Sequence, residues 1–215
     1  MVRAQGSPGG PSTWLAWFQR LRAIAQTGMA YAQDPYDQER YQEISTLAEQ
    51  MLGMLLDVPP QRIGGIYLSE RGYPTPKVDV RAGVFRDGQV LLVRETSDGG
   101  WSLPGGWADE QQSPRQCVER EVREESGFLV RAASLVAVRD RSLHPYEPPR
   151  LEHVYKLLFL CELVGGSGSP GLETSEVGFF HPDRLPELSR GRTLEADIRQ
   201  LARHLRRPEL PPTFD

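Results

Sequence analysis

The sequence predicts an α/β protein in which a mixed β-sheet lies between helical layers. Two observations support this. Segments with strand composition follow one another across short turns, whereas segments with helical periodicity come in separate blocks. The chain of 215 residues is long enough for one well-cored domain and a small appendage. We expect residues 1–12 to be disordered, residues 13–70 to form an N-terminal helical domain and residues 71–210 to form the main domain.

Two amphipathic helices are predicted in the N-terminal part. Apolar residues recur at helical spacing from Ser12 onward and again after Asp34-Pro35, a pair typical of a helix start. These apolar positions are Trp14, Phe18, Leu21 and Ala25 in the first helix and Tyr41, Ile44, Ala48, Met51 and Leu55 in the second. Two helices of this length do not form a stable core alone, so they must pack on the main domain or on a second subunit. We predict a homodimer through these helices.

The main domain is predicted to begin with a β-hairpin. Residues 77–85 and 89–94 have strand composition, and Asp87-Gly88 between them is typical of a two-residue hairpin turn. A second turn at residues 98–100 leads through residues 101–103 into the next segment, and further strands are expected over residues 128–138, 153–163 and 177–180. A helix from about Thr193 to Leu205 ends the organised part, and a proline-rich tail follows it.

A glycine turn and a helix occupy residues 103–128, LPGGWADEQQSPRQCVEREVREESGF. Ser113 suits the N-cap of this helix, Pro114 its first position and Gly127 the left-handed residue that ends it.

Three glutamates of this helix are spaced so that they lie on one face. Glu121, Glu124 and Glu125 stand at i, i+3 and i+4. Like charges at this spacing repel, which favours a hard divalent cation with oxygen ligands among them. A glutamate-rich helix with interleaved arginines is by itself more often a solvated surface with ordinary ion pairs. The complete spacing from the glycine turn to Gly127 favours a site instead.

The same segment resembles the Nudix box, whose pattern is Gly, five residues, Glu, seven residues and then Arg-Glu-apolar-any-Glu-Glu-any-Gly-apolar. The matching positions are Gly106, Arg120, Glu121, Val122, Glu124, Glu125, Gly127 and Phe128. One position departs, because Gln112 stands where the pattern has its first glutamate. The segments GYPTPKVDVRAGVF, HVYKLLFLCEL and ETSEVGFF, with the N-terminal helices, resemble the subgroup that hydrolyses X-linked nucleoside diphosphates such as ADP-ribose or CDP-choline. The resemblance implies a Nudix-type α/β/α sandwich with a small N-terminal two-helix domain.

The resemblance also implies roles for the box residues. Glu121, Glu124 and Glu125 would bind Mg²⁺, or Mn²⁺ in its place, and the carbonyl of Gly105 would be a further ligand. Such an ion neutralises phosphate oxygens and lowers the pKa of a bound water. Arg120 would orient a box carboxylate through a charge-assisted pair.

Gln112 leaves the proton acceptor open, because an amide carries no charge and cannot act as a base. Asp109 or Glu110 in the same loop could compensate for the missing carboxylate. In the family the base is often a glutamate in a loop far from the box. Glu173 and Glu176 are the candidates here, and we prefer Glu173.

Substrate recognition is expected to use arginines and aromatic residues. Arg81 lies in the strand that in this family faces the nucleotide, and Arg139 and Arg141 end a later strand. Any of them could bind a phosphate through two parallel hydrogen bonds. Trp101, Tyr146 and Tyr155 could stack on a base, although Trp101 is more consistent with packing on the sheet. We predict substrate binding by Arg81, Arg139 and Tyr155.

Composition narrows the class of protein. The chain is 39% hydrophobic and 25% charged, which argues against wholesale disorder. Its net charge of −4 gives no attraction to nucleic acid or to an anionic membrane. No apolar run or signal peptide is evident, so we expect a cytoplasmic protein. Cys117 and Cys161 occupy positions typical of small buried hydrophobes, so no disulfide is expected.

The sequence therefore predicts metal-dependent hydrolysis of a nucleoside diphosphate linked to X, which yields a nucleoside monophosphate and phospho-X. A pyrophosphatase that removes nucleoside triphosphates is the alternative enzyme. A Nudix-fold sensor that binds a nucleotide without cleaving it is the alternative from another class, because Gln112 breaks the pattern.

Overall fold

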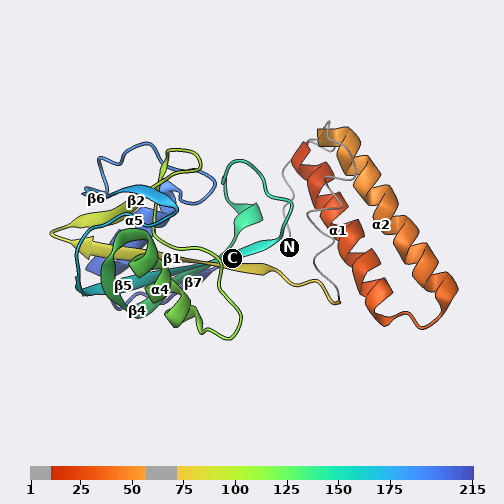
Figure 1. Ribbon diagram of the computed structural model, residues 1–215, viewed down its shortest axis with the longest axis horizontal. Helices are drawn as coiled ribbons and strands as arrows, with labels where there is room; N and C mark the ends of the chain where they lie inside the picture. The colour runs from red at the N-terminus through yellow and green to blue at the C-terminus, as the bar shows by residue number, and fades with distance from the viewer. Residues whose placement is uncertain (1–10, 57–71) are drawn as a thin grey trace. The chain divides into compact units, whose positions relative to one another are not determined.

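The computed structural model of the protein describes residues 11–56 and 72–215, and the chain divides into two compact units, Met1–Thr75 and Pro76–Asp215 (Figure 1). The disorder expected at the N-terminus and the connector after Leu56 fall largely outside the described residues. Among the helices that are described, none is long and apolar enough to cross a membrane.

The N-terminal unit contains the two predicted helices, α1 (Pro11–Tyr31) and α2 (Pro35–Leu56). The carboxylate of Asp34 accepts a hydrogen bond of 2.8 Å from the backbone N–H of Tyr36, so the predicted start of α2 is confirmed. A Cβ at Gly28 would lie 2.4 Å from the ring of Tyr41, so glycine at this position allows the two helices to pack closely.

The main unit contains a seven-stranded mixed sheet in the order β3-β2-β1-β5-β4-β7, and β6 also pairs with β2. Strands β1 and β5 are parallel, as are β4 and β7, and the other pairs are antiparallel. The elements are β1 (Lys77–Arg86), β2 (Gln89–Glu95), β3 (Trp101–Ser102), α4 (Pro114–Ser126), β4 (Phe128–Asp140), η1 (Arg141–Leu143), β5 (Val154–Gly166), β6 (Thr174–Phe180), α5 (Glu195–Arg206) and β7 (Thr213–Phe214).

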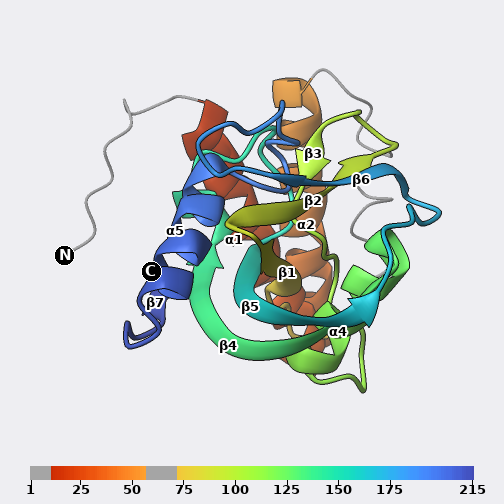
Figure 2. The ribbon, with the colours of Figure 1, turned by 90° about the vertical axis from the view of Figure 1, so that its left-hand side faces the viewer.

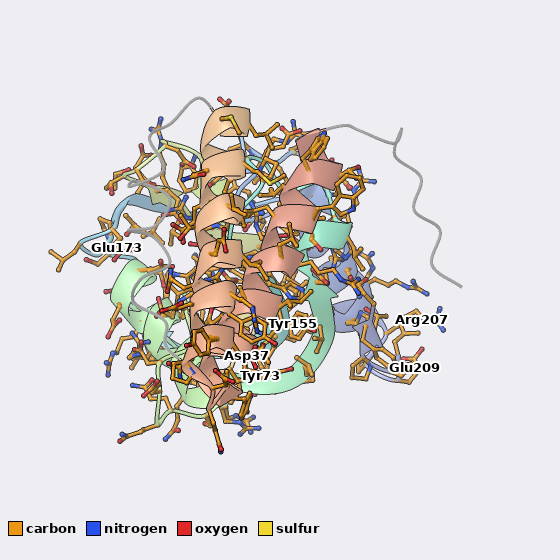
Figure 3. The ribbon with its side chains drawn as sticks, turned by 90° about the vertical axis from the view of Figure 1, so that its right-hand side faces the viewer. Asp37, Tyr73, Tyr155, Glu173, Arg207 and Glu209 are labelled. Carbon is orange, nitrogen blue, oxygen red and sulfur yellow. The ribbon has the colours of Figure 1, made fainter. Side chains whose placement is uncertain are left out.

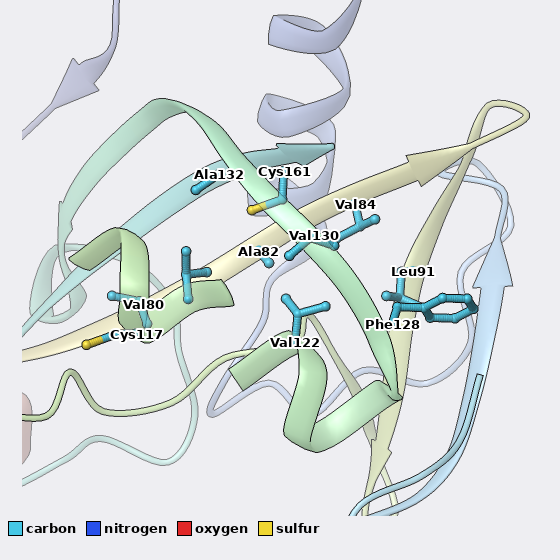
Figure 4. Close-up of a cluster of buried hydrophobic side chains, with 11 residues drawn as sticks. Val80, Ala82, Val84, Leu91, Cys117, Val122, Phe128, Val130, Ala132 and Cys161 are labelled. Atoms are coloured by element: carbon cyan, nitrogen blue, oxygen red, sulfur yellow. The ribbon is translucent and has the colours of Figure 1, made fainter. Parts of the chain in front are cut away.

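Two apolar layers cover the two faces of this sheet. One cluster joins Cys117, Val118 and Val122 of α4 to one face (Figure 4). The other joins Ile198 and Leu201 of α5 to the opposite face, and Figure 2 shows the two helices on either side of the strands. The predicted α/β/α sandwich with a mixed sheet is therefore confirmed. Both cysteines are buried and free, as expected.

Local signals in the sequence also have the predicted outcome. Asp87 and Gly88 have φ angles of 51° and 76° and connect β1 to β2. The Ser113 hydroxyl accepts a hydrogen bond from the backbone N–H of Gln116, Pro114 opens α4, and Gly127 ends it with a φ of 71°.

Two strands differ from the expected pattern. Strand β6 begins at Thr174 rather than Val177, because its pairing with β2 extends to Glu95. The proline-rich tail contains β7, which pairs with β4 and was not predicted. A two-residue strand has no periodicity of its own, so only its partner reveals it.

Candidate active site

The glycine turn that precedes α4 lies beside β1, where Trp107 forms an isolated antiparallel β-bridge with Asp79. Its backbone bonds join Val80 N to Gly106 O, Ala82 N to Pro104 O and Ala108 N to Val78 O, at 2.8 to 2.9 Å. Gly105 has a φ of 146°, and a Cβ on it would lie 2.0 Å from the carbonyl oxygen of Val80. Glycine is thus required for the turn to approach the sheet.

Two box carboxylates of α4 face this turn, and we call Glu121 and Glu125 the carboxylate wall. The Glu125 carboxylate accepts a 2.8 Å hydrogen bond from the backbone N–H of Gly105. A Cβ on Gly106 would lie 2.9 Å from a carboxylate oxygen of Glu121, so glycine keeps that space open. Burial raises the pKa of Glu125 to about 8 and also raises the pKa of Glu121.

Glu124 lies on the outer side of this wall. Its side chain is 49% exposed and forms a 2.8 Å ion pair with Arg120, whereas the Glu121 side chain is only 14% exposed. All three glutamates are expected from the sequence to share one site. Glu121 and Glu125 line the cleft described below, whereas Glu124 is not among its lining residues.

Arg120 holds the acidic groups at the edge of the wall. Its guanidinium forms ion pairs with Glu121 at 2.9 Å and with Asp109 at 2.8 Å, in addition to Glu124. It also donates a 3.2 Å hydrogen bond to the amide oxygen of Gln112. The residue that replaces the first glutamate of the pattern therefore contacts the arginine through its side chain.

A cleft of roughly 270 Å³ opens in front of the carboxylate wall. It is lined by Asp79, Arg81, Glu95, Gly105, Gly106, Trp107, Asp109, Arg120, Glu121, Glu125, Arg150, Glu173 and Arg192. Six of these residues are carboxylates and four are arginines, so negative charge prevails. A phosphorylated substrate would be repelled unless additional positive charge were present.

The residues of the cleft fit a hard divalent cation. The carboxylate wall offers oxygen donors, and Mg²⁺ in proteins is usually bound by one or two carboxylates together with waters and substrate phosphates. Gly106 leaves room beside Glu121, and burial of Glu125 raises its pKa more than the nearby charge of Arg81 lowers it. Among the residues that the structure describes, no three Asp, Glu, His or Cys side chains already form a cluster of metal ligands.

Beneath the cleft runs a series of buried polar residues that we call the buried charge chain. It consists of Arg81, Asp79, Lys156, Tyr146, Asp197 and Arg139. Arg81 donates two hydrogen bonds of 2.9 Å to Asp79, and the Lys156 ammonium lies 2.8 Å from the same carboxylate. Burial disfavours the ionised form of Asp79, but the two cations lower its pKa to about 2.

The buried charge chain continues to α5 through an aromatic residue. The Lys156 ammonium lies 5.2 Å from the ring centre of Tyr146, whose hydroxyl donates to both oxygens of Asp197 at 2.8 and 2.9 Å. Arg139 pairs with Asp197 at 2.7 Å. Of the two arginines expected to bind substrate, Arg81 lines the cleft, whereas Arg139 is buried against Asp197 and does not.

The two candidate base residues differ in position. Glu173 lines the cleft, whereas Glu176 forms a 2.6 Å ion pair with Arg94. The backbone carbonyl of Glu173 accepts hydrogen bonds from the N–H and hydroxyl of Thr96, which fix this part of the loop. Tyr155 is not among the residues that line the cleft, and its side chain lies far from Glu173 (Figure 3).

Five residues of the cleft were not anticipated from the sequence. They are Asp79, Glu95, Trp107, Arg150 and Arg192. Glu95 is buried at the end of β2, where it accepts a 2.6 Å hydrogen bond from Ser102 and pairs with Arg192 at 3.1 Å. The available signals were a charged residue that ends an apolar strand and a tryptophan directly after the glycine pair.

The two units match two family models. Residues 12–67 match a model described as a UDP-X-like N-terminal oligomerisation domain, and residues 75–202 match the NUDIX domain. A Bacillus subtilis (strain 168) protein named "Putative ADP-ribose pyrophosphatase" is 43% identical over 202 residues, which cover 94% of this chain and 97% of that protein.

Solved structures of pyrophosphate-cleaving proteins are also similar to this chain. An ADP-ribose pyrophosphatase from Streptococcus suis 89-1591 is 40% identical with a TM-score of 0.60, and the match covers 66% of this chain and 100% of that one. A UDP-X diphosphatase is 29% identical with a TM-score of 0.61, and that match covers 96% of this chain and 100% of the other.

Proposed function

Because the chain belongs to the Nudix family of hydrolases, we propose that it hydrolyses the pyrophosphate bond of a nucleoside diphosphate linked to a second group X. ADP-ribose is the first substrate to consider, since two relatives at 40% and 43% identity carry that activity in their names. CDP-choline and UDP-linked groups belong to the same class. The observation that carries the proposal is the carboxylate wall, where Glu121 and Glu125 face a glycine turn at the edge of a polar cleft.

We propose Mg²⁺ as the cofactor, with Mn²⁺ as a substitute, and Glu121 and Glu125 as its main protein ligands. The carbonyl of Gly105 is the further protein ligand that we propose. When bound, the ion would neutralise phosphate oxygens and make a bound water more acidic. Glu124 would contribute through Arg120, which holds Glu121 in place by an ion pair of 2.9 Å.

The remaining residues of the cleft position the substrate and accept a proton. Arg81 offers a positive charge at the floor of the cleft, and Asp79 fixes the orientation of its guanidinium. We propose Glu173 as the general base, because it lines the cleft and the fixed loop holds its backbone. Glu176 is engaged with Arg94, which supports the choice between the two.

The decisive experiment is a substrate panel in ¹⁸O-labelled water with Mg²⁺. ADP-ribose, CDP-choline, a UDP-linked sugar and ATP are incubated with the protein, and the products are identified by mass spectrometry. We expect AMP and ribose 5-phosphate from ADP-ribose, and the labelled product identifies the phosphorus that is attacked. A preference for ATP would replace the proposal with removal of triphosphates. Nucleotide binding without any product would replace it with a sensor.

We propose that the N-terminal unit joins two copies of the chain. Its matching model describes an oligomerisation domain, and α1 and α2 expose large apolar side chains around a cavity of roughly 370 Å³. These side chains include Trp14, Trp17, Met54 and Leu55. Because monomers rarely expose such a surface, a second copy is the expected cover. Light scattering that gives the molar mass of one chain would contradict this.

A further inference from the structure

Trp107 is an exposed aromatic side chain in a cleft of charged residues. It is 40% exposed, and among the described residues that line the cleft it is the sole aromatic one. Its neighbour Gly106 lies against Glu121, so the indole belongs to the segment that borders the carboxylate wall. An exposed indole leaves apolar surface in contact with water. A ligand that covers this surface would gain the free energy of burying it.

The position of Trp107 is fixed by the sheet. Its backbone lies opposite Asp79 of β1, and the hydrogen bonds of Gly106 and Ala108 hold the residues on either side of it. Its backbone therefore needs no ordering when a ligand arrives. An aromatic side chain on a backbone that is already ordered is the kind of group that provides binding energy at low entropic cost.

The face of the indole is not sealed by its neighbour. The guanidinium carbon of Arg150 lies 5.3 Å from the ring centre, whereas Arg86 approaches the ring of Phe179 to 4.0 Å. The contact with Arg150 shows that a planar group can lie over this ring. Because the distance from Arg150 to the Trp107 ring is longer than that from Arg86 to the Phe179 ring, the guanidinium covers the indole less closely, and Trp107 remains exposed.

We infer that Trp107 is the stacking surface for the nucleobase of the substrate. The inference rests on the proposed function, since the base is the flat aromatic group that all nucleoside diphosphates share, whereas X varies. Stacking on an aromatic side chain tolerates any base because every base has a π face. The carboxylate wall would then act on the diphosphate while Trp107 holds the base at the rim of the cleft.

The test compares the binding of AMP and of ribose 5-phosphate by titration calorimetry in the presence of Mg²⁺. Trp107→Leu removes the ring, and Trp107→Phe keeps one. We expect Trp107→Leu to weaken AMP binding about five- to one-hundred-fold and ribose 5-phosphate binding less than two-fold. Trp107→Phe should retain AMP affinity within about five-fold. Circular dichroism melting shows whether each variant is folded.

Tyr155→Leu is the matched rival variant, because Tyr155 is 39% exposed but does not line the cleft. A larger loss of AMP affinity in Tyr155→Leu than in Trp107→Leu would overturn the inference. So would an equal loss for AMP and ribose 5-phosphate in folded Trp107→Leu. The proposed function fails separately, if the wild-type protein releases no product from any linked diphosphate.

Discussion

The carboxylate wall and the buried charge chain lie next to each other and are both rich in charge, but they differ in balance. In the buried charge chain, Asp79 is paired with Arg81 and Lys156, and Asp197 is paired with Arg139. In the wall, Glu125 is buried with only a backbone N–H as its hydrogen-bond donor, and its pKa is raised to about 8. Buried charges in direct ion pairs serve the fold, whereas a buried carboxylate whose nearby charge of Arg81 does not offset its burial is a place for a cation.

We expect the largest difference between the carboxylate wall and the buried charge chain in how substitutions affect turnover. Glu125→Gln removes a charge from the wall but leaves an amide that still accepts the N–H of Gly105, so we expect the variant to fold. Its melting temperature should be unchanged or higher, because burial no longer opposes an ionised group. We expect kcat/KM for ADP-ribose with Mg²⁺ to fall by about a thousand-fold or more, since several kcal/mol of charge stabilisation are lost.

Glu124→Gln is the matched control for that loss. Its carboxylate is half exposed and contacts Arg120, so we expect less than about a ten-fold reduction in the same assay. Equal losses in the two variants would contradict the separation of Glu124 from the wall and would place it among the metal ligands.

The carboxylate wall was largely predictable from the sequence, because its signals are local. Ser113, Pro114 and Gly127 mark the ends of α4, and the spacing of Glu121 and Glu125 places both on one helical face. The exposure of Glu124 was not predictable, because it depends on where the glycine turn lies beside β1. Spacing defines the face of a helix, but the neighbouring segment decides which part of that face is covered.

The buried charge chain could not be assembled from the sequence. Asp79 and Lys156 are direct partners in the parallel pairing of β1 with β5, although 77 residues separate them. Arg139 likewise finds Asp197 on a helix that follows much later. Each charged residue lies in an otherwise apolar segment, and this signals that a buried partner is required. It does not identify the partner, so Arg139 could be taken for a substrate-binding residue.

The next largest effect should be on the free energy of unfolding, and we expect it from a substitution in the buried charge chain. Asp79→Asn leaves Arg81 and Lys156 buried without their shared counterion, which we expect to lower the free energy of unfolding by about 3–5 kcal/mol. Urea unfolding followed by tryptophan fluorescence measures this change. Lys156→Met is the control, because Asp79 keeps both hydrogen bonds from Arg81. We expect a change below about 2 kcal/mol there, and a loss as large as that of Asp79→Asn would contradict the proposed balance.

The smallest effect is a dependence of the free energy of unfolding on pH that is caused by titration of Lys156. Burial lowers the pKa of its ammonium to about 8, although Asp79 opposes the shift. Between about pH 8 and the unfolded value of 10.5, the unfolded chain binds a proton that the folded chain has lost, so stability rises with pH across this window. We expect a contribution of about 2 to 3 kcal/mol, measured as the difference between wild-type and Lys156→Met urea unfolding curves from pH 7.5 to 10.5. Parallel stability profiles for the two proteins would show that Lys156 stays charged in the folded chain, and the pairing with Asp79 would then outweigh burial.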